Sequence, residues 1–529
     1  MPVPRQVDNV EFIRDEVSAY SRHWTIVRHA IEGEIAVKDR LEDYLPRPDP
    51  DEEDAGSRYK AYIKRAVFYG VTSRTQEGLI GQIFRKQPNQ TLPDVLKHVQ
   101  RDADGDGVSL LQTAKRACAY TVAYGRAGLL VDFPAREDEG AATAKEVEDG
   151  TVRPTITVYS PWDCINWDTK RVGSKTVLSL VVLRELYYER QEGAFAIETK
   201  TQYRVLRLVE HEGKNCARVE IWRKGDTAKN SRKKDEYASY EDYDLCDSDG
   251  SAMEELPFMF IGSKNNDPTI DEPPLYPIAS LNLAHYRNSA DYEEACFITG
   301  QPTPVAIGLT ESWLDTIMKG VFKLGSRAFV PLPAEADAKL LQAEPNIMPI
   351  EAMKHKEDQM MAIGAKLVET EITSAERTAT EVTVENASET SILESTAVNV
   401  SRALEWALTK CVLLLGESVE ENSETEEGNV KYELNTNFDL ATPSAEEMRV
   451  IEESYLAGNL LQEEVRVAWQ RQGIAFKDYD EFKTQSKIEM DERDSRELDK
   501  QKKVIDMQPK PPAGQTGGGK PAPTKSGSK

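Results

Sequence analysis

The chain has 529 residues, of which 39% are apolar and 30% are charged, and its formal net charge is −25 at pH 7. This length predicts two to four domains or a multi-layered subunit, because one small core cannot organise so long a chain. The acidic balance argues against a protein that grips nucleic acid through a basic surface. It remains compatible with a protein that lets DNA pass without holding it.

The sequence shows no sign of a membrane span, a disulfide framework or a metal site. No apolar run approaches the roughly 20 residues that cross a bilayer, and residues 1–12 lack a secretory signal pattern, so we expect an intracellular protein. The six histidines lack metal-ligand spacing, and we expect neither a metal nor any other cofactor. The cysteines form no CxxC pair and are expected to be free and buried: Cys118, Cys164, Cys216, Cys246, Cys296 and Cys411.

The N-terminal third is predicted to be mostly helical. Apolar spacing predicts helices over 9–43 and 57–86, separated by the acidic, proline-rich loop "LPRPDPDEEDAG". A further helix is predicted over 109–126, with Ser109 as its N-cap, and it leads into the strand "GLLVDF". Residues 135–151 are acidic and rich in Ala and Gly, and they are predicted to form a loop.

Between residues 155 and 261 the apolar period changes to two, which predicts one β-rich layer. The aromatic clusters "YSPWDCINW" and "YEDYD" lie in this region, and we interpret them as strand and turn packing rather than as a binding surface. The predicted strands are "TITVYS", "VLSLVVLREL", "TQYRVLRLVE", "ARVEIWR" and "LPFMFIG".

The helical period resumes in the C-terminal half. A long helix over 276–299 precedes a small β-α-β unit at 301–345, in which Thr310 caps a short helix. Two more helices, 346–370 and 388–416, flank a polar loop that contains "TSAERTATEVTVEN". The remaining predicted elements are the strand "VKYELNTNFDL", a helix begun by a capping box of Ser444 and Glu447 and ending near Gly458, helices over 460–472 and 480–506, and a disordered tail.

Sequence motifs give no support for catalysis. "DADGDG" supplies Asp102, Asp104 and Asp106 as half of a calcium loop, but the twelfth position is Thr113 instead of Glu, so we interpret it as an acidic turn. A GxxxxGK[ST] phosphate loop after a strand, a GxSxG elbow and a nucleophile–histidine pair are all missing from the sequence. We therefore expect that the protein is not an enzyme.

The order of these elements, together with "SRYKAYIKRAVFYG", "PPLYPIASLNLAHYRNSADYEEACF" and "ERTATEV", resembles the portal (head-to-tail connector) protein of tailed bacteriophages over residues 10–480. The resemblance implies an α+β, predominantly helical portal fold with wing, stem, clip and crown regions. It divides the chain into wing 1–270, stem helix 271–300, clip 301–345, stem helix 346–370, tunnel loop 371–387, wing helix and strand 388–442, crown 443–480, and a charged helix and disordered tail 481–529.

The same resemblance implies a structural role in the virion. Copies made in the host bacterial cytoplasm would form a ring, expected to be a dodecamer, at one capsid vertex. Double-stranded DNA would be packaged and ejected through this ring without sequence-specific contacts. The implied partners are the terminase large subunit, which would hydrolyse ATP, head–tail adaptor or tail proteins, and the major capsid and scaffolding proteins. No membrane is implied.

Two groups of site residues follow from the resemblance. The tunnel loop has few apolar groups, and its hydroxyls can exchange weak hydrogen bonds while its acids limit how tightly Arg377 holds a phosphate. The DNA-channel candidates are Thr373, Ser374, Glu376, Arg377, Thr378, Thr380, Glu381, Thr383 and Glu385. The candidates for binding terminase or adaptor are Glu311, Trp313, Asp315, Lys319, Lys323 and Arg327 in the clip.

Two alternatives remain open from the sequence alone. One is another virion or scaffold-like assembly protein that uses the same mixture of elements without a DNA channel. The other is a metal-dependent nuclease whose site is assembled from dispersed carboxylates, because the 91 acidic residues allow many such pairs.

Overall fold

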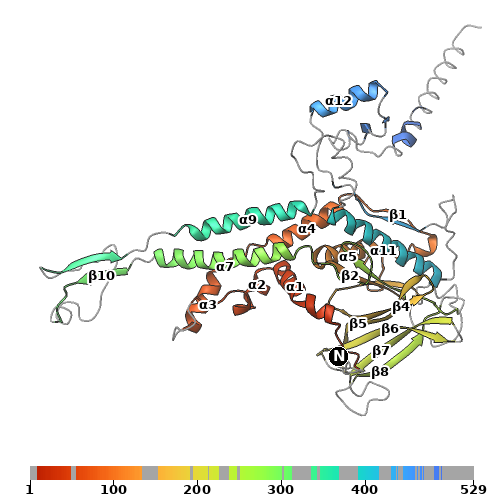
Figure 1. Ribbon diagram of the computed structural model, residues 1–529, viewed down its shortest axis with the longest axis horizontal. Coiled ribbons are helices and arrows are strands. Elements are labelled where there is room, and N and C mark those ends of the chain that lie inside the picture. The colour runs from red at the N-terminus through yellow and green to blue at the C-terminus, as the bar shows by residue number, and fades with distance from the viewer. Residues whose placement is uncertain are drawn as a thin grey trace, which may run out of the picture. The chain divides into compact units, whose positions relative to one another are not determined.

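The computed structural model divides into two compact units, Met1–Phe438 and Asp439–Lys529 (Figure 1). The predicted loop 135–151, most of the clip, the tunnel loop and the tail lie outside the described residues. The structure describes residues 9–48, 55–133, 153–190, 193, 195–211, 214–224, 237–246, 251–300, 303–311, 335–341, 346–367, 391–415, 430–436, 438, 445–458, 461–462, 465–466, 469, 482–487 and 490.

The N-terminal helices are shorter than the two long helices predicted. Gly33 ends the first with φ of 92°, a conformation that costs a glycine little, and its amide bonds His29 O at 3.0 Å. The second predicted helix is interrupted between Arg65 and Val71. The elements are α1 (Asp15–Glu32), α2 (Glu34–Lys38), the 3-10 helix η1 (Leu41–Asp43), α3 (Ala55–Arg65), α4 (Val71–Ile83) and, after a short strand, the 3-10 helix η2 (Asp94–Leu96).

The predicted N-cap at Ser109 is confirmed. Helix α5 (Leu110–Tyr124) begins with a capping box, in which the Gln112 amide donates to Ser109 Oγ at 3.3 Å and the Ser109 amide donates to Gln112 Oε1 at 3.0 Å. This satisfies two of the amide groups that a helix start leaves without partners.

The turn before that helix is held by its own carboxylates. Asp102 Oδ1 accepts hydrogen bonds from the amides of Gly105 at 2.8 Å and Gly107 at 3.0 Å, while Asp104 Oδ1 accepts from Val108 at 3.1 Å. These contacts confirm that "DADGDG" forms an acidic turn.

A three-stranded antiparallel sheet forms the centre of the first unit. Its order is β3-β2-β9, with β2 (Arg126–Asp132) between β3 (Thr155–Tyr159) and β9 (Phe258–Gly262). Helices α5 and α11 (Ile392–Leu414) both contact this sheet. The apolar face predicted for this helix is confirmed except at its end, because Leu415 is only half-buried and follows the last residue of α11. The other predicted residues are all buried: Leu393, Ala397, Val400, Leu404, Ala407 and Cys411.

A separate five-stranded antiparallel sheet follows the chain in the order β4-β5-β6-β7-β8. The prediction of one β-rich layer is therefore wrong. Residues on one face join the main core, and the other face carries a small cluster of Ile165, Val182, Tyr203 and Val205. The strands are β4 (Cys164–Val172), β5 (Lys175–Glu189), β6 (Glu198–His211), β7 (Lys214–Lys224) and β8 (Tyr237–Asp244).

Both aromatic clusters singled out in the sequence serve packing. Trp167 of β4 lies edge-on to Phe260 of β9, with ring centroids 5.3 Å apart, and Trp162 packs edge-on to Tyr124 at 5.0 Å. The segment "YEDYD" belongs to β8. The interpretation of these clusters as strand and turn packing is confirmed.

The expectation of a predominantly helical portal fold is wrong. Of the residues that the structure describes, 46% are helical and 26% lie in strands, which makes the fold an α+β mixture. The sequence interpretation missed β4 and β8, in which apolar and polar residues do not alternate clearly. In β4, for example, the side chains after Trp167 are all exposed. Strand β11 (Asp337–Leu341), also exposed throughout, was missed for the same reason.

Two long helices pack against each other and carry a β-ribbon. Helix α7 (Tyr276–Thr299) matches the predicted 276–299, and α9 (Met348–Lys366) lies within the predicted 346–370. Between them, β10 (Thr303–Ile307) pairs antiparallel with β11. Because α7 leads into β10 and β11 leads back to α9, the ribbon lies at the far end of the helix pair (Figure 1). We call these four elements the arm.

The remaining elements are short. Strand β1 (Asn89–Thr91) pairs antiparallel with β12 (Lys431–Glu433). Among the described residues of the predicted strand "VKYELNTNFDL", those three of β12 are in strand conformation. The second unit contains α12 (Ala445–Leu456), and Gly458 follows it with φ of 79°. All six cysteines are free, four of them buried, while Cys246 is half-buried and Cys296 is exposed.

One buried histidine, His29, and one half-buried histidine, His98, make stability depend on pH. Burial lowers the pKa of both His29 and His98 below the ordinary histidine value. The charge of Arg40 lowers the pKa of His29 further. Both rings are therefore neutral in the folded chain, while the unfolded chain takes up their protons near pH 6.5. Because the unfolded state then binds more protons, the free energy of unfolding falls as pH falls below that value.

We predict a lower melting temperature at pH 5 than at pH 7, with a smaller difference in a His29→Gln/His98→Gln variant. Thermal unfolding of both proteins at the two pH values measures the effect. Carboxylates contribute equally to both proteins, so the difference between them isolates the histidines. Equal pH dependence in the two proteins would contradict the prediction.

Candidate assembly site

The arm is fixed to the rest of the first unit, which we call the body, through buried polar contacts along α7. Asn282, which is fully buried, accepts from Thr72 Oγ1 at 3.0 Å and donates to Tyr69 O at 2.7 Å. Ser289 Oγ donates to Val67 O at 2.7 Å. Each such bond contributes roughly 1 kcal/mol, and losing one partner leaves a buried group unsatisfied. These contacts occupy the stretch 66–72, where the predicted long helix is interrupted.

Helix α3 holds α7 further along. Tyr62 Oη donates to Asp291 Oδ1 at 2.6 Å, and Glu294 forms ion pairs with Arg65 and with Arg58, the latter at 3.7 Å. Burial, followed by the hydrogen bond to Asp291, raises the pKa of Tyr62, so the hydroxyl stays protonated. Helix α7 is thus tied to the body by hydrogen bonds and ion pairs as far as Glu294.

Large apolar side chains are exposed beyond Glu294. Leu340 and Leu341 of β11 are 67% and 68% exposed, and the other large exposed apolar residues in this part of the arm are Phe297, Ile298, Val305, Ile307, Ile347 and Met348. A two-stranded ribbon alone is marginally stable in water. Contiguous exposed apolar surface marks an interaction site. The far end of the arm therefore has the properties of a surface that another protein covers.

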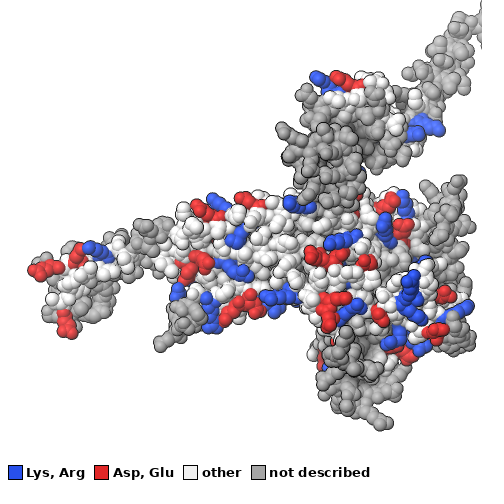
Figure 2. All heavy atoms as spheres, in the orientation of Figure 1, with Lys and Arg blue, Asp and Glu red and all other residues white. Residues whose placement is uncertain are grey.

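The two helices of the arm pair through packing and a polar contact. Met360 of α9 is buried against the body of the unit, and His285 Nε2 lies 3.1 Å from Glu357 Oε1. The opposite side of α9 exposes Met361, Ala362 and Ala365. On the face shown in Figure 2, Lys and Arg side chains are interspersed with Asp and Glu over the first unit. This part of the surface does not present a dense cationic face.

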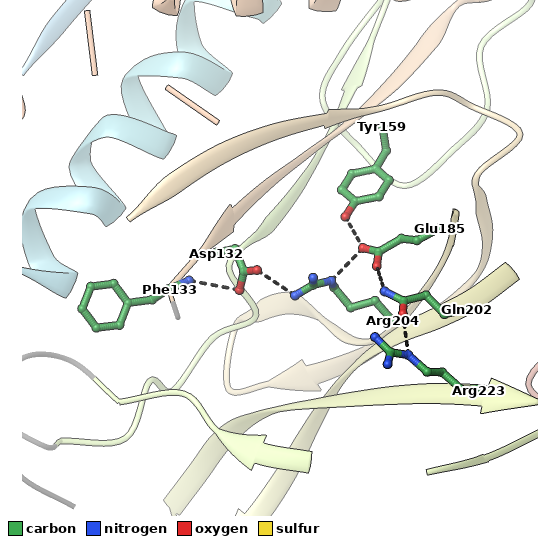
Figure 3. Close-up of polar contacts among 7 residues, drawn as sticks. All are labelled: Asp132, Phe133, Tyr159, Glu185, Gln202, Arg204 and Arg223. Carbon is green, nitrogen blue, oxygen red and sulfur yellow. Dashed lines mark hydrogen bonds and ion pairs between the residues drawn. The ribbon is translucent and has the colours of Figure 1, made fainter. Parts of the chain in front are cut away.

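A polar cluster joins the two sheets of the body (Figure 3). Arg204 of β6 forms ion pairs with Asp132 of β2 and Glu185 of β5, both at 2.7 Å. Tyr159 of β3 donates to Glu185 Oε1 at 2.5 Å. Burial acts to lower the pKa of Arg204, but the charges of Asp132 and Glu185 outweigh it and raise that pKa. One guanidinium therefore neutralises carboxylates from both sheets.

The cluster extends across the five-stranded sheet. Gln202 Nε2 donates to Glu185 Oε2 at 2.7 Å, and Arg223 Nε donates to Gln202 Oε1 at 2.8 Å (Figure 3). The Arg223 guanidinium lies over the rings of Tyr187 and Tyr240, 4.4 Å and 4.2 Å from their centroids. Such cation–π contacts contribute roughly 0.5–2 kcal/mol. The network gives the sheet a fixed orientation against the core.

A second set of contacts links the two sheets to the loop that precedes α7. The buried Arg126 guanidinium lies 3.6 Å from the Phe260 ring centroid and 4.2 Å from that of Trp167, and Arg126 Nη1 donates to Pro268 O at 2.8 Å. Arg14 approaches the Trp167 ring at 4.6 Å. Burial lowers the pKa of Arg126 to about 10. This value still leaves the guanidinium charged at neutral pH.

The structure describes one of the residues proposed from the sequence as partner-binding. Glu311 is exposed shortly after β10. The other clip candidates and all nine DNA-channel candidates lie outside the described residues. The residues that join the sheets were missed by the sequence interpretation, because Asp132, Glu185 and Arg204 lie on three separate strands and belong to no motif.

Within the described ranges, no three His, Cys, Asp or Glu residues cluster as metal ligands would. Over the same ranges, no helix has the length and apolarity needed to span a bilayer.

Comparisons with known proteins give one family match and two structural likenesses. Residues 274–412 match the model of a domain of unknown function, DUF4055. The chain is similar to a chain in the virion of a native gene transfer agent particle, with 14% identity, and to one in the neck of an empty gene transfer agent particle, with 15% identity. Both likenesses have a TM-score of 0.35 and cover 83% of this chain and 98% of the other. No curated protein matches the chain.

Proposed function

We propose that this chain is a structural virion protein that acts as a portal. Copies of the chain close into a ring at one capsid vertex, and double-stranded DNA is packaged and ejected through the bore. The observation that carries the proposal is the arm, in which two long helices end in a ribbon with uncovered apolar side chains. The element order and the segments quoted from the sequence support it independently.

In this account, the apolar end of the arm is covered by neighbouring copies of the chain. A two-stranded ribbon with Leu340 and Leu341 exposed gains most when an adjacent ribbon and helix pair bury these side chains. Helix α7 has 24 residues, which at about 1.5 Å per residue spans roughly 36 Å. A ring of such arms is long enough to line a short tunnel, and we propose a dodecamer.

The acidic composition suits a conduit that must release its cargo. Lysine and arginine contacts to phosphates displace counterions and bind DNA strongly at low salt. A chain with net charge −25 and interspersed surface charges offers few such contacts (Figure 2). Repulsion reaches only about 8 Å at physiological salt, so it acts where wall and duplex are close.

The partners follow from the same proposal. Residues 301–345, which include the ribbon, dock the terminase large subunit during packaging and head–tail adaptor or tail proteins afterwards, through the surface that neighbouring copies leave uncovered. The body contacts the major capsid and scaffolding proteins. The ring itself is passive and not an enzyme, and ATP hydrolysis belongs to the docked motor.

We predict that deleting residues 373–385 leaves ring formation intact but impairs DNA packaging or retention. The reason is that this hydroxyl-rich, charged segment is proposed to contact DNA and carries almost no large apolar side chains that a core would need. Particle-associated, nuclease-protected DNA measures the effect. Loss of ring assembly in the deletion variant would show that the segment is structural instead.

Native mass spectrometry of the purified full chain tests the proposal. A portal gives one closed oligomer of defined stoichiometry, whereas an assembly protein without a channel gives monomers or an open-ended series of sizes. The second result would remove the portal proposal and favour the alternative virion assembly role.

A further inference from the structure

A groove of about 670 Å³ lies in the body of the first unit, away from the far end of the arm. One side of α1 lines it, facing the first half of α7, and the segment from Arg40 to Tyr44 closes its end. Figure 1 shows α1 beside α7. None of the contacts described above for the arm, or for the polar cluster between the sheets, uses these residues.

The groove is rich in cationic groups for so acidic a chain. Arg22, Arg40 and Arg287 line it, and the one acidic residue in the lining is Asp43. Among the described residues, none of these three arginines forms a salt bridge with a carboxylate, although Arg287 Nε donates to Tyr44 O at 3.0 Å. The arginines and Asp43 together give a local charge of +2. Unneutralised guanidinium groups around a hollow are the usual recognition elements for oxyanions.

Hydrogen bonds among residues that line the groove determine which atoms of His29 and Tyr44 donate a proton. Arg40 Nη2 lies 3.1 Å from His29 Nε2, and His29 Nδ1 lies 2.7 Å from Tyr44 Oη. Arginine can only donate, so His29 Nε2 accepts and carries no proton. The neutral ring then holds its proton on Nδ1 and donates it to Tyr44 Oη.

The Tyr44 hydroxyl is consequently left with its own proton to donate. Tyr44 is only 8% exposed and lines the groove. Among the described residues, its hydroxyl has no hydrogen-bond acceptor. A buried donor without an acceptor is costly. Water or a bound ligand in the groove can supply that acceptor.

We propose that this groove binds a phosphate group. Three guanidinium groups and the Tyr44 hydroxyl are all donors, which matches the several acceptor oxygens of phosphate. The local charge of +2 matches a phosphate dianion better than the single charge of one carboxylate. Ile26, Tyr276 and Leu283 also line the groove and give an apolar wall against which an organic group attached to the phosphate can pack. The ligand is inorganic phosphate or the phosphate of a small monoester such as a nucleotide.

Isothermal titration calorimetry of the full-length protein tests this site at constant ionic strength. The probes are inorganic phosphate, adenosine monophosphate and malonate, the last being a dianion without phosphate. We expect saturable binding of phosphate with one site per chain. Tighter binding of adenosine monophosphate than of phosphate assigns a monoester, and equal binding assigns inorganic phosphate. Absence of saturable binding by both, or malonate binding as tightly as phosphate, overturns the proposal.

Variants locate the binding to the groove. Tyr44→Phe removes the oriented donor, and Arg22→Gln removes an exposed cation whose loss leaves the packing intact. Each is expected to weaken binding roughly 10-fold, the range for one hydrogen bond to a charged group. Arg28→Gln is the matched control on the same helix, because Arg28 lies over the Trp162 ring instead. Unchanged affinity in Arg22→Gln, or equal weakening in Arg28→Gln, overturns the assignment.

Discussion

Replacing Leu340 and Leu341 together by Asp is expected to abolish ring assembly while leaving the subunit folded. Both side chains lie on β11, and both are about two-thirds exposed in the single chain. Fully burying a leucine contributes roughly 1.5–3 kcal/mol, so two leucines that are two-thirds exposed account for roughly 2–4 kcal/mol at each subunit contact. That loss alone weakens association at least about 30-fold, and two added carboxylates weaken it further.

The assembly state of this variant is measured by analytical ultracentrifugation beside the wild-type chain. A variant with Ile35→Asp and Leu186→Asp is the matched control. These residues are also exposed and apolar, but they lie on α2 and β5. The control should assemble normally. A Leu340→Thr/Leu341→Thr variant keeps strand-forming residues and should assemble weakly. Normal assembly of the Asp variant would show that the ribbon lies outside the subunit interface.

Replacing Arg204 by Met is expected to destabilise the first unit by about 3 kcal/mol. The change leaves Asp132 and Glu185 close together without their shared cation, and both side chains are mostly buried. We place the effect at the lower end of the range for broken buried pairs, because some solvent reaches these carboxylates. In a unit of this size the melting temperature should fall by roughly 3 °C.

Thermal unfolding of Arg204→Met and Arg207→Met compares two sites on the same strand. Arg207 pairs with Glu220 at 3.3 Å, but its side chain is more exposed. Its loss should change stability by less than about 1 kcal/mol. Adding Asp132→Asn and Glu185→Gln to Arg204→Met should restore part of the stability, because the unpaired charges are removed. Equal losses of stability in Arg204→Met and Arg207→Met would contradict the role assigned to Arg204 in joining the two sheets.

Elements with strong local signals could be predicted from the sequence. The apolar residues of α11 repeat at spacings of three and four, and Ser109 stands as an N-cap residue at the start of α5, so the sequence predicts both helices. The bounds of α7 match because Pro273, Pro274 and Pro277 mark its beginning and Gly300 its end. These signals need no knowledge of tertiary contacts.

Features that depend on distant residues could not be predicted. Strand β9 pairs with β2, more than a hundred residues earlier. This pairing places β9 in the three-stranded sheet and not in the five-stranded sheet that precedes it in the chain. The break between α3 and α4 is stabilised by Asn282 and Ser289 of α7, over 200 residues away. The groove likewise combines α1 with α7, so its three arginines formed no pattern in the sequence.

The candidate site could be predicted only in outline. The sequence located the two arm helices and β10, but it missed β11, whose five residues are all exposed and lack alternation. The apolar surface at the end of the arm became visible only when exposed fractions were known. The channel candidates between Thr373 and Glu385 lie outside the described residues and stay a prediction.

Electron microscopy of the purified full-length protein tests the central claim most directly. The account predicts closed rings in end views, with a central hole wide enough for a DNA duplex and the arms gathered around it. Filaments, dispersed monomers, or rings whose centre is filled with protein would contradict it.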